Sequence, residues 1–217
     1  MFYFEEINSY KVLKSDFVVN IGLNHCFTTR WVGPNNVYPE HIYHYPQQTH
    51  SDHVEIVDER IEYPDTDGLI ITQKNIPIAL KFADCTPLIF YDTKQKIGAI
   101  SHAGWRGTAQ KIGPKTIKKM NSNPADIIAI IGPAIGLCCY EVSDEVRGKL
   151  LDTVKDATNL VQGRNVDLKQ INARQLQEIG VTKIDICHYC TSCDNDLFYS
   201  YRKENGTAER HYAILML

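Results

Sequence analysis

Residues 77–107 read PIALKFADCTPLIFYDTKQKIGAISHAGWRG. Three short apolar runs in this stretch, at 77–82, 87–91 and 97–101, predict β-strands. Cys85 lies in the break between the first two runs, and His102 directly follows the third. A sheet can therefore bring a thiol and an imidazole together. We expect the chemistry of the protein at this pair, with a third partner, His50, from the upstream loop at 48–51.

Composition limits the kind of protein. The 217 residues carry a formal charge of −3, which gives no electrostatic reason to expect a nucleic-acid or membrane partner. No uncharged run approaches the ~20 residues of a membrane span, and the first residues do not resemble a signal peptide. We therefore expect a cytoplasmic protein with one domain, residues 1–217. Seven cysteines then favour reduced thiols, metal ligands or a reactive thiolate over disulfides.

The remaining chain also favours strands over helices. Runs rich in β-branched and aromatic residues predict strands at 2–7, 17–21, 26–29, 41–45, 54–57, 69–71, 126–131, 183–187, 198–201 and 211–217, and residues 31–40 predict an irregular loop. Helices are expected at 108–120, with a kink or restart at Gly113-Pro114, at 143–154 and at 166–179. The late helices indicate an α/β protein with mixed sheets rather than a regular βαβ repeat.

His50, Cys85 and His102 support two chemical interpretations. Two imidazoles and a thiolate fill three tetrahedral positions of Zn²⁺ and leave the fourth for water or substrate. Alternatively, Cys85 is a nucleophile and His102 its base, which requires only hydrogen-bond reach and a low thiol pKa. His50 separates the two, since a Cys-His pair does not need it. A core cysteine with histidines in polar loops is the non-functional alternative.

Three arginines are candidates for binding an anion. Arg106 stands in a glycine-flanked turn before a predicted helix, where its planar guanidinium could hold a phosphate or carboxylate bidentately. The alternative is a surface arginine at a helix start. Arg30 and Arg202 could converge on the same anion or form ordinary surface ion pairs.

A second group of cysteines has spacing typical of metal sites. Cys187, Cys190 and Cys193 form a C-x-x-C-x-x-C pattern that can bind zinc or an iron–sulfur cluster, although structural or redox-inert thiols are the simpler interpretation. A closed four-thiolate site would have to borrow Cys138, Cys139 or His188. Because adjacent side chains of an extended backbone point to opposite faces, we expect that Cys138 and Cys139 do not both serve one site.

Seven segments, in order along the chain, carry a family resemblance. They are CFTTR at 26–30, QTHS at 48–51, DGLI at 67–70, ADCTP at 83–87, HAGWRG at 102–107, IGPAIGLCCYEV at 131–142 and FYSYR at 198–202. With these motifs the chain resembles the YfiH-type laccase-domain family. The resemblance implies a four-layer α-β-β-α sandwich with mixed sheets, related to the catalytic domain of cytotoxic necrotizing factor deamidases. It also implies a zinc site at His50, Cys85 and His102.

The resemblance further implies an activity on purine nucleosides. It is phosphorolysis of adenosine, inosine and methylthioadenosine, with adenosine deamination, so nucleosides and phosphate are the expected partners. Arg106 is the leading phosphate candidate, and Asp84, Arg30 and Arg202 are further candidate substrate contacts. An alternative is a Cys-His hydrolase or amidase acting on cell-wall precursors, in line with family members described as peptidoglycan editing factors. Copper-dependent polyphenol oxidation is less well supported, because multicopper sites need many histidines and this chain has eight.

The chain departs from the family pattern in two places, the first of which is a candidate part of the substrate wall. The segment between Arg30 and the loop at 48–51 is shorter than the family pattern implies, which points to altered specificity or to a degenerate binding protein. Residues 206–210 also have Ala-Glu where Thr-Gly is expected, although Arg210 is kept.

Overall fold

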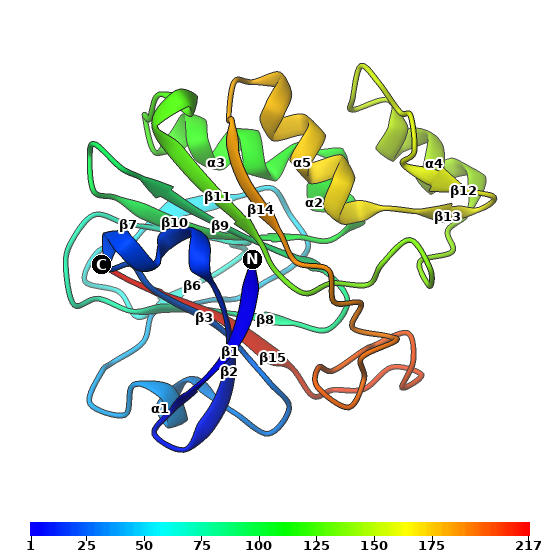
Figure 1. Ribbon diagram of the computed structural model, residues 1–217. Coiled ribbons are helices and arrows are strands. Elements are labelled where there is room, and N and C mark those ends of the chain that lie inside the picture. Colours follow the sequence, from blue (N-terminus) through cyan, green and yellow to red (C-terminus); the bar gives the residue numbers. More distant parts are fainter.

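The protein is built on two stacked β-sheets, seen in a computed structural model that describes all 217 residues (Figure 1). The five-stranded sheet is antiparallel throughout and has the order β1 (Phe2–Ile7), β2 (Tyr10–Ser15), β3 (Asn24–Thr28), β15 (His211–Met216), β8 (Ile78–Phe82). The six-stranded sheet is mixed and has the order β14 (Lys183–Ile186), β11 (Ile127–Ile131), β9 (Thr86–Asp92), β10 (Gly98–Ala103), β7 (Gly68–Ile71), β5 (Val54–Ile56). The paired strands β4 (Tyr45–Pro46) with β6 (Glu62–Tyr63), and β12 (Val161–Gln162) with β13 (Asn165–Val166), are separate.

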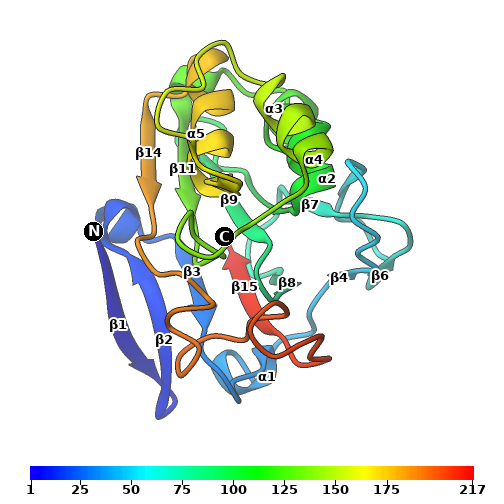
Figure 2. The ribbon, with the colours of Figure 1, turned by 90° about the vertical axis from the view of Figure 1, so that its right-hand side faces the viewer.

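Helices cover the outer face of the six-stranded sheet (Figure 2). They are α2 (Trp105–Ala109), α3 (Ile112–Lys119) and α5 (Leu168–Glu178), and α4 (Asp144–Leu151) packs against α2. On the far face of the five-stranded sheet lie only α1 (Pro34–Val37) and its flanking loops. Two short 3₁₀-helices, η1 (Asp16–Ile21) and η2 (Pro124–Asp126), complete the chain. The predicted α-β-β-α order is therefore confirmed, with a thin fourth layer.

Alternating side chains hold the layers together. In β9, Ile89 lies in the core between the two sheets, whereas its neighbours Leu88 and Phe90 pack beneath the helices. In β15, Leu215 faces the other sheet and Ile214 faces the α1 side. Each such side chain contributes about 1.5–3 kcal/mol on burial, and a one-residue slip would exchange the two faces. The register that positions the site is thus fixed by burial on both sides.

Several sequence predictions are wrong in detail. Residues 17–21 form η1 rather than a strand, because the Ser15 hydroxyl accepts the Phe17 N–H and Gly22 ends the turn at φ +69°. The strand in this region is β2, at 10–15. Residues 31–40 contain the short helix α1. Residues 198–201 are irregular instead of a strand, and the Phe198 N–H is bonded to the Asp194 carbonyl.

The expected restart of the helix at 108–120 occurs, but earlier in the chain. Lys111 adopts φ +59° between α2 and α3, so Gly113 and Pro114 fall in the first turn of α3. Proline is tolerated there because a first-turn N–H has no helical partner. No helix of the protein combines the length and apolarity needed to cross a membrane.

Candidate active site

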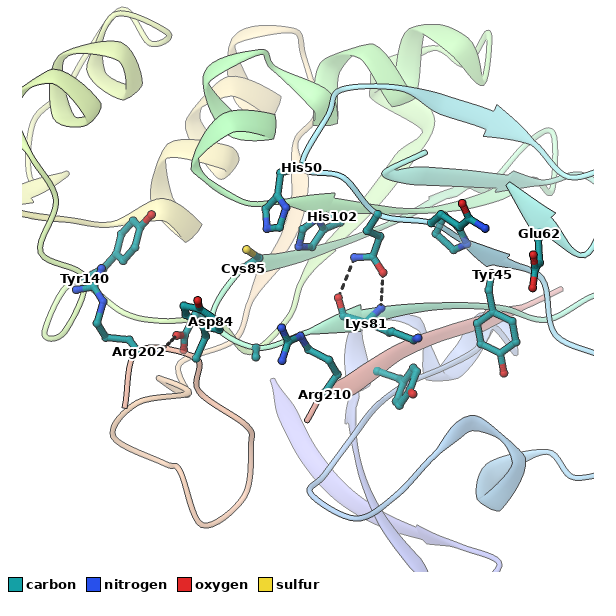
Figure 3. A pocket seen from close by; sticks show the side chains of 16 residues that line it. Tyr45, His50, Glu62, Lys81, Asp84, Cys85, His102, Tyr140, Arg202 and Arg210 are labelled. Carbon is teal, nitrogen blue, oxygen red and sulfur yellow. Dashed lines mark hydrogen bonds between the residues drawn. The ribbon is translucent and has the colours of Figure 1, made fainter. Parts of the chain in front are cut away.

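Three separate elements bring His50, Cys85 and His102 together (Figure 3). Cys85 lies in the turn between β8 and β9, His102 lies within β10, and His50 comes from the loop before β5. Their ligand atoms all lie within 4.8 Å of one another. The two imidazole rings are 4.9 Å apart between centroids and nearly perpendicular. The structure therefore places the predicted triplet at one point.

Asp67 holds two parts of this triplet in place, the loop that carries His50 and the ring of His102. Its carboxylate is fully buried and accepts the backbone N–H groups of Thr49, His50 and Ser51 at 3.1, 3.1 and 2.7 Å. The same carboxylate lies 2.7 Å from Nδ1 of His102. With Nδ1 donating to a carboxylate, Nε2 of His102 is left with its lone pair free for a ligand or proton. In the sequence, Asp67 stands out only as part of the DGLI motif at 67–70, and this role was not predicted.

The backbone near the triplet is tightly constrained. His50 has φ +63° and Asp84 has φ +84°, which costs about 1–3 kcal/mol for each such residue. At Gly104, a Cβ atom would lie 2.9 Å from Sγ of Cys85 and 3.1 Å from Cδ2 of His50. Only glycine leaves room for these two side chains, so the HAGWRG motif contributes space as well as His102.

The charges of the triplet are mutually supportive. Burial opposes ionisation of Cys85, but the adjacent His102 and His50 rings outweigh it and lower the pKa of the thiol to about 6. Burial likewise opposes protonation of His102, yet Cys85 and Asp67 raise its pKa well above the ordinary value. Burial would raise the pKa of Asp67, but hydrogen bonds from His102 and Ser51 lower it to about 2. Cys85 is thus held as a thiolate near neutral pH.

The donor set suits a metal ion. A thiolate and two imidazoles are ligands of catalytic zinc, and a carboxylate bonded to the rear nitrogen of a ligating histidine is the usual supporting contact. The space that Gly104 leaves beside both Sγ of Cys85 and the His50 ring is consistent with this use. A cysteine nucleophile with His102 as base and Asp67 as its orienting group fits the same three side chains.

The triplet opens into a cavity of about 890 Å³, within the range of small-molecule sites. Its wall combines tyrosines with cationic groups. Lining residues include Tyr45, Tyr140, Tyr201 and Tyr212, together with Lys81, Arg202 and Arg210. Flat aromatic rings can stack on a purine, and cations can hold a phosphate.

The predicted arginines divide into two groups. Arg202 lines the cavity, and its guanidinium donates to the carbonyl of Glu141 at 3.1 Å. Arg210, which was not predicted as a site residue, lines the cavity as well. Arg106 and Arg30 do not. Arg106 is solvent-exposed and stacks over the Trp105 ring at 4.4 Å, outside the lining of the cavity.

Arg30 does not line the cavity and forms an ion pair with Glu204 instead. Its guanidinium pairs with both carboxylate oxygens of Glu204, at 2.9 and 3.3 Å, and stacks over Tyr199. The expectation that Arg30 converges on a bound anion is therefore not met, because its donors are used to hold the loop that carries Arg202. The ion-pair alternative describes it better.

Asp84 lines the cavity and also connects its walls. Oδ1 accepts the hydroxyl of Thr191 at 2.6 Å, and Oδ2 accepts the backbone N–H of Arg202 at 2.7 Å. Its carbonyl accepts the N–H of Ile135 at 3.0 Å. With both carboxylate oxygens used in this way, Asp84 positions neighbouring segments around Cys85.

Comparison with characterised sequences gives consistent matches. Residues 25–217 match the family described as multi-copper polyphenol oxidoreductase laccase. The chain is 36% identical over 193 residues to purine nucleoside phosphorylase YlmD of Bacillus subtilis (strain 168), covering 79% of this chain and 69% of that protein. It is 33% identical over 197 residues to purine nucleoside phosphorylase SERP0752 of Staphylococcus epidermidis, covering 82% and 74%. The match to YlmD of Geobacillus stearothermophilus, at 37% identity, covers 70% of this chain and 60% of the relative.

Solved structures share the fold over nearly the whole chain. The crystal structure of Bacillus licheniformis hypothetical protein YfiH superposes with a TM-score of 0.86 at 29% identity, covering 95% of this chain and 96% of the other. YlmD from Geobacillus stearothermophilus gives a TM-score of 0.86 at 27% identity, covering 98% of each chain.

Proposed function

The chain belongs to the family described as multi-copper polyphenol oxidoreductase laccases. We propose that it is a zinc-dependent purine nucleoside phosphorylase. We propose adenosine, inosine and methylthioadenosine as substrates, with adenosine deamination as a side activity. The proposal is supported by curated relatives that are named purine nucleoside phosphorylases.

One observation carries the proposal. The cavity that opens over His50, Cys85 and His102 combines stacking surfaces with two arginines, Arg202 and Arg210. In phosphorolysis, a phosphate oxygen forms a bond to C1′ of the ribose while the C1′–N9 bond breaks. The bonding electrons leave with the purine, which takes up a proton, and the sugar leaves as its 1-phosphate. Such a reaction needs a site that binds the phosphate and the purine of the nucleoside in the same cavity, both next to C1′.

The chain's own residues have separable tasks in this proposal. His50, Cys85 and His102 would hold the zinc ion, and Asp67 keeps the Nε2 lone pair of His102 available by accepting from Nδ1. The ion would supply Lewis-acid chemistry at the floor of the cavity. Arg202 and Arg210 orient the phosphate, and the tyrosines exclude water from the sugar.

The test is an assay of base release from each nucleoside, with and without phosphate, after loading with zinc. His102→Ala should lower the rate more than about 100-fold, because it removes a proposed zinc ligand. Loss of only the contact that supports such a ligand typically costs about 10–100-fold. His53→Ala is the matched control, since His53 lies on the same loop, exposed and outside the triplet. Base release that does not depend on phosphate would contradict the phosphorylase proposal.

Two arginine variants test the phosphate contact. Arg202→Met should raise the KM for phosphate about tenfold or more, as expected for a lost charged hydrogen bond, while Arg106→Met should leave it nearly unchanged. The opposite pattern would restore Arg106 as the phosphate ligand and contradict the assignment to the cavity arginines.

A Cys-His hydrolase or amidase is the second candidate. It is favoured by the chain of contacts from Asp67 to His102 to Cys85 and by the lowered pKa of the thiol. Amide hydrolysis on cell-wall precursors that persists after chelation, and is abolished by alkylation of Cys85, would support it. A Cys-His₂ ligand set also accommodates copper, so metal analysis of the purified protein is needed to decide between zinc and copper.

A further inference from the structure

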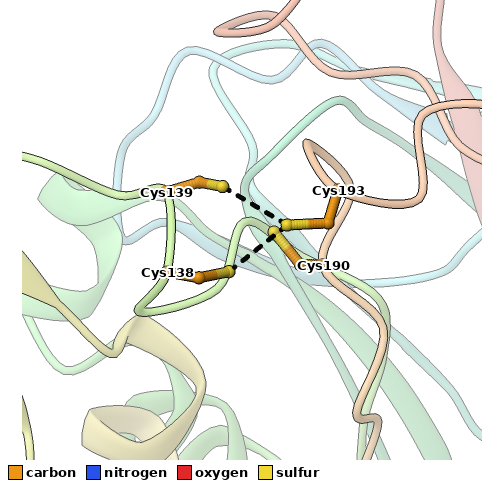
Figure 4. Close-up of side chains that lie close together, drawn as sticks. All are labelled: Cys138, Cys139, Cys190 and Cys193. Carbon is orange, nitrogen blue, oxygen red and sulfur yellow. Dashed lines mark hydrogen bonds between the residues drawn. The ribbon is translucent and has the colours of Figure 1, made fainter.

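A second group of residues, which shares no member with the triplet, brings four sulfur atoms together (Figure 4). The Sγ atoms of Cys138, Cys139, Cys190 and Cys193 all lie within 4.8 Å of one another, and both Cys138 and Cys139 are 3.5 Å from Cys193. These separations are too long for disulfides, whose S–S bond is about 2.05 Å. Four thiolates around a tetrahedral zinc, each about 2.3 Å from the metal, would stand about 3.8 Å apart. The observed arrangement is close to that spacing.

The expectation that Cys138 and Cys139 point apart is wrong, because their backbone is not extended. The N–H groups of Cys139 and Tyr140 both bond to the carbonyl of Gly136, so the segment is a tight turn. This turn directs both sulfur atoms toward Cys193. Adjacent cysteines can therefore serve one site here.

The second half of the group is a C-x-x-C segment, Cys190 to Cys193, facing that turn. The N–H of Gly136 donates to Sγ of Cys190 at 3.2 Å, which supplies partial positive charge to the sulfur. A Cβ atom on Gly136 would lie 3.3 Å from both Sγ of Cys138 and Cβ of Cys190. The two segments therefore approach as closely as the backbone allows, and Gly136 is the residue that permits it.

We propose that Cys138, Cys139, Cys190 and Cys193 form a structural zinc site with four thiolate ligands. Four protein ligands leave no position for substrate, in contrast to the Cys-His₂ triplet. The remaining cysteines have other surroundings: Cys26 and Cys187 are buried in the apolar core, and Cys85 belongs to the triplet.

The site would fasten two segments that shape the active-site cavity. Tyr140, which lines the cavity, directly follows Cys139. Thr191, within the C-x-x-C segment, donates to Asp84 next to Cys85. A bound zinc ion thus holds the wall of the cavity without contacting substrate.

The first experiment counts metal in the full chain, expressed with added zinc and purified without oxygen. The double variant C190S/C193S should hold one zinc ion fewer per chain than the wild type. Cys187→Ala is the matched control, because Cys187 belongs to the same cysteine run but lies outside the group, and it should lose none. Equal zinc content in the wild type and the double variant would overturn the proposal.

The second experiment does not depend on the folding of that variant or on the proposed enzymatic function. In H50A/H102A, which lacks the triplet ligands, one zinc ion should remain, and X-ray absorption should give a shell of sulfur alone at about 2.3 Å. Absence of zinc, or a nitrogen-containing shell, would overturn the proposal. So would mass spectrometry of the anaerobically purified wild type that shows these cysteines joined as disulfides. Failure of the nucleoside assay would leave this zinc count unchanged.

Discussion

Replacing Asp67 with asparagine should weaken both the fold and metal binding, because each carboxylate oxygen serves at least two N–H donors. Oδ2 accepts from Thr49 and Ser51, and Oδ1 accepts from His50 and His102. An asparagine must turn its amino group toward one of these pairs. Two donors, at least one of them in a partly buried bond, then lose their acceptor at about 1–3 kcal/mol each, so the free energy of unfolding should fall by about 2–6 kcal/mol.

Metal binding should suffer in either orientation of the amide. If the amino group faces His102, that ring must accept at Nδ1, which places its proton on Nε2, where the metal would bind. If it faces the other pair, the loop that carries His50 loses two anchors. Loss of such a supporting contact typically costs 10–100-fold in metal affinity.

The assay combines denaturant unfolding of the metal-free protein with competition titration of zinc against a chromogenic chelator. Asp65→Asn is the matched control, because Asp65 lies in the same turn but is exposed and should change neither quantity by much. If Asp67→Asn bound zinc as tightly as the wild type and unfolded at the same denaturant concentration, the assigned role of Asp67 would be refuted.

Two further predictions concern space and buried charge. Gly104→Ala should weaken zinc binding about tenfold or more in the same titration, because the new methyl group would crowd Cys85; unchanged affinity would contradict this. His211 is fully buried with neither ring nitrogen bonded, and its pKa falls from 6.5 to about 3 because burial, and to a lesser degree Arg210, disfavours the charged ring. The folded state therefore loses stability as pH falls below about 6.5, and His211→Phe should make that decline shallower by up to ~1.4 kcal/mol per pH unit; equal slopes in urea unfolding from pH 7 to 5 would contradict it.

Much of the fold follows from periodicity, and the exceptions have physical causes. The strands β8, β9, β10 and β11 were predicted within a residue or two because each is an apolar run between polar turns. Residues 17–21 look similar in composition, yet only Val18 is buried. Local capping by Ser15 decides the conformation there, and an apolar run alone does not contain that information.

Site residues divide in the same way. His50, Cys85 and His102 could be predicted from their residue types and motifs. Asp67 offered a weaker signal, since an aspartate before a glycine is typical of turns. The exposed stacking of Arg106 on its neighbour Trp105 could not be read from the sequence, because a glycine-flanked arginine suits both a phosphate site and a solvent-exposed helix start.

Asp84 connects the four-cysteine group to the loop that carries Cys85. Its left-handed backbone, at φ +84°, is unfavourable for a residue with a side chain. The conformation is held by three hydrogen bonds: with Ile135 from the segment before Cys138, with Thr191 from the segment between Cys190 and Cys193, and with Arg202. Each of these segments must be in place for Asp84 to turn Cys85 toward the two histidines. The four-cysteine group lies on the first two segments, so a zinc ion bound there would stabilise the strained turn that positions Cys85.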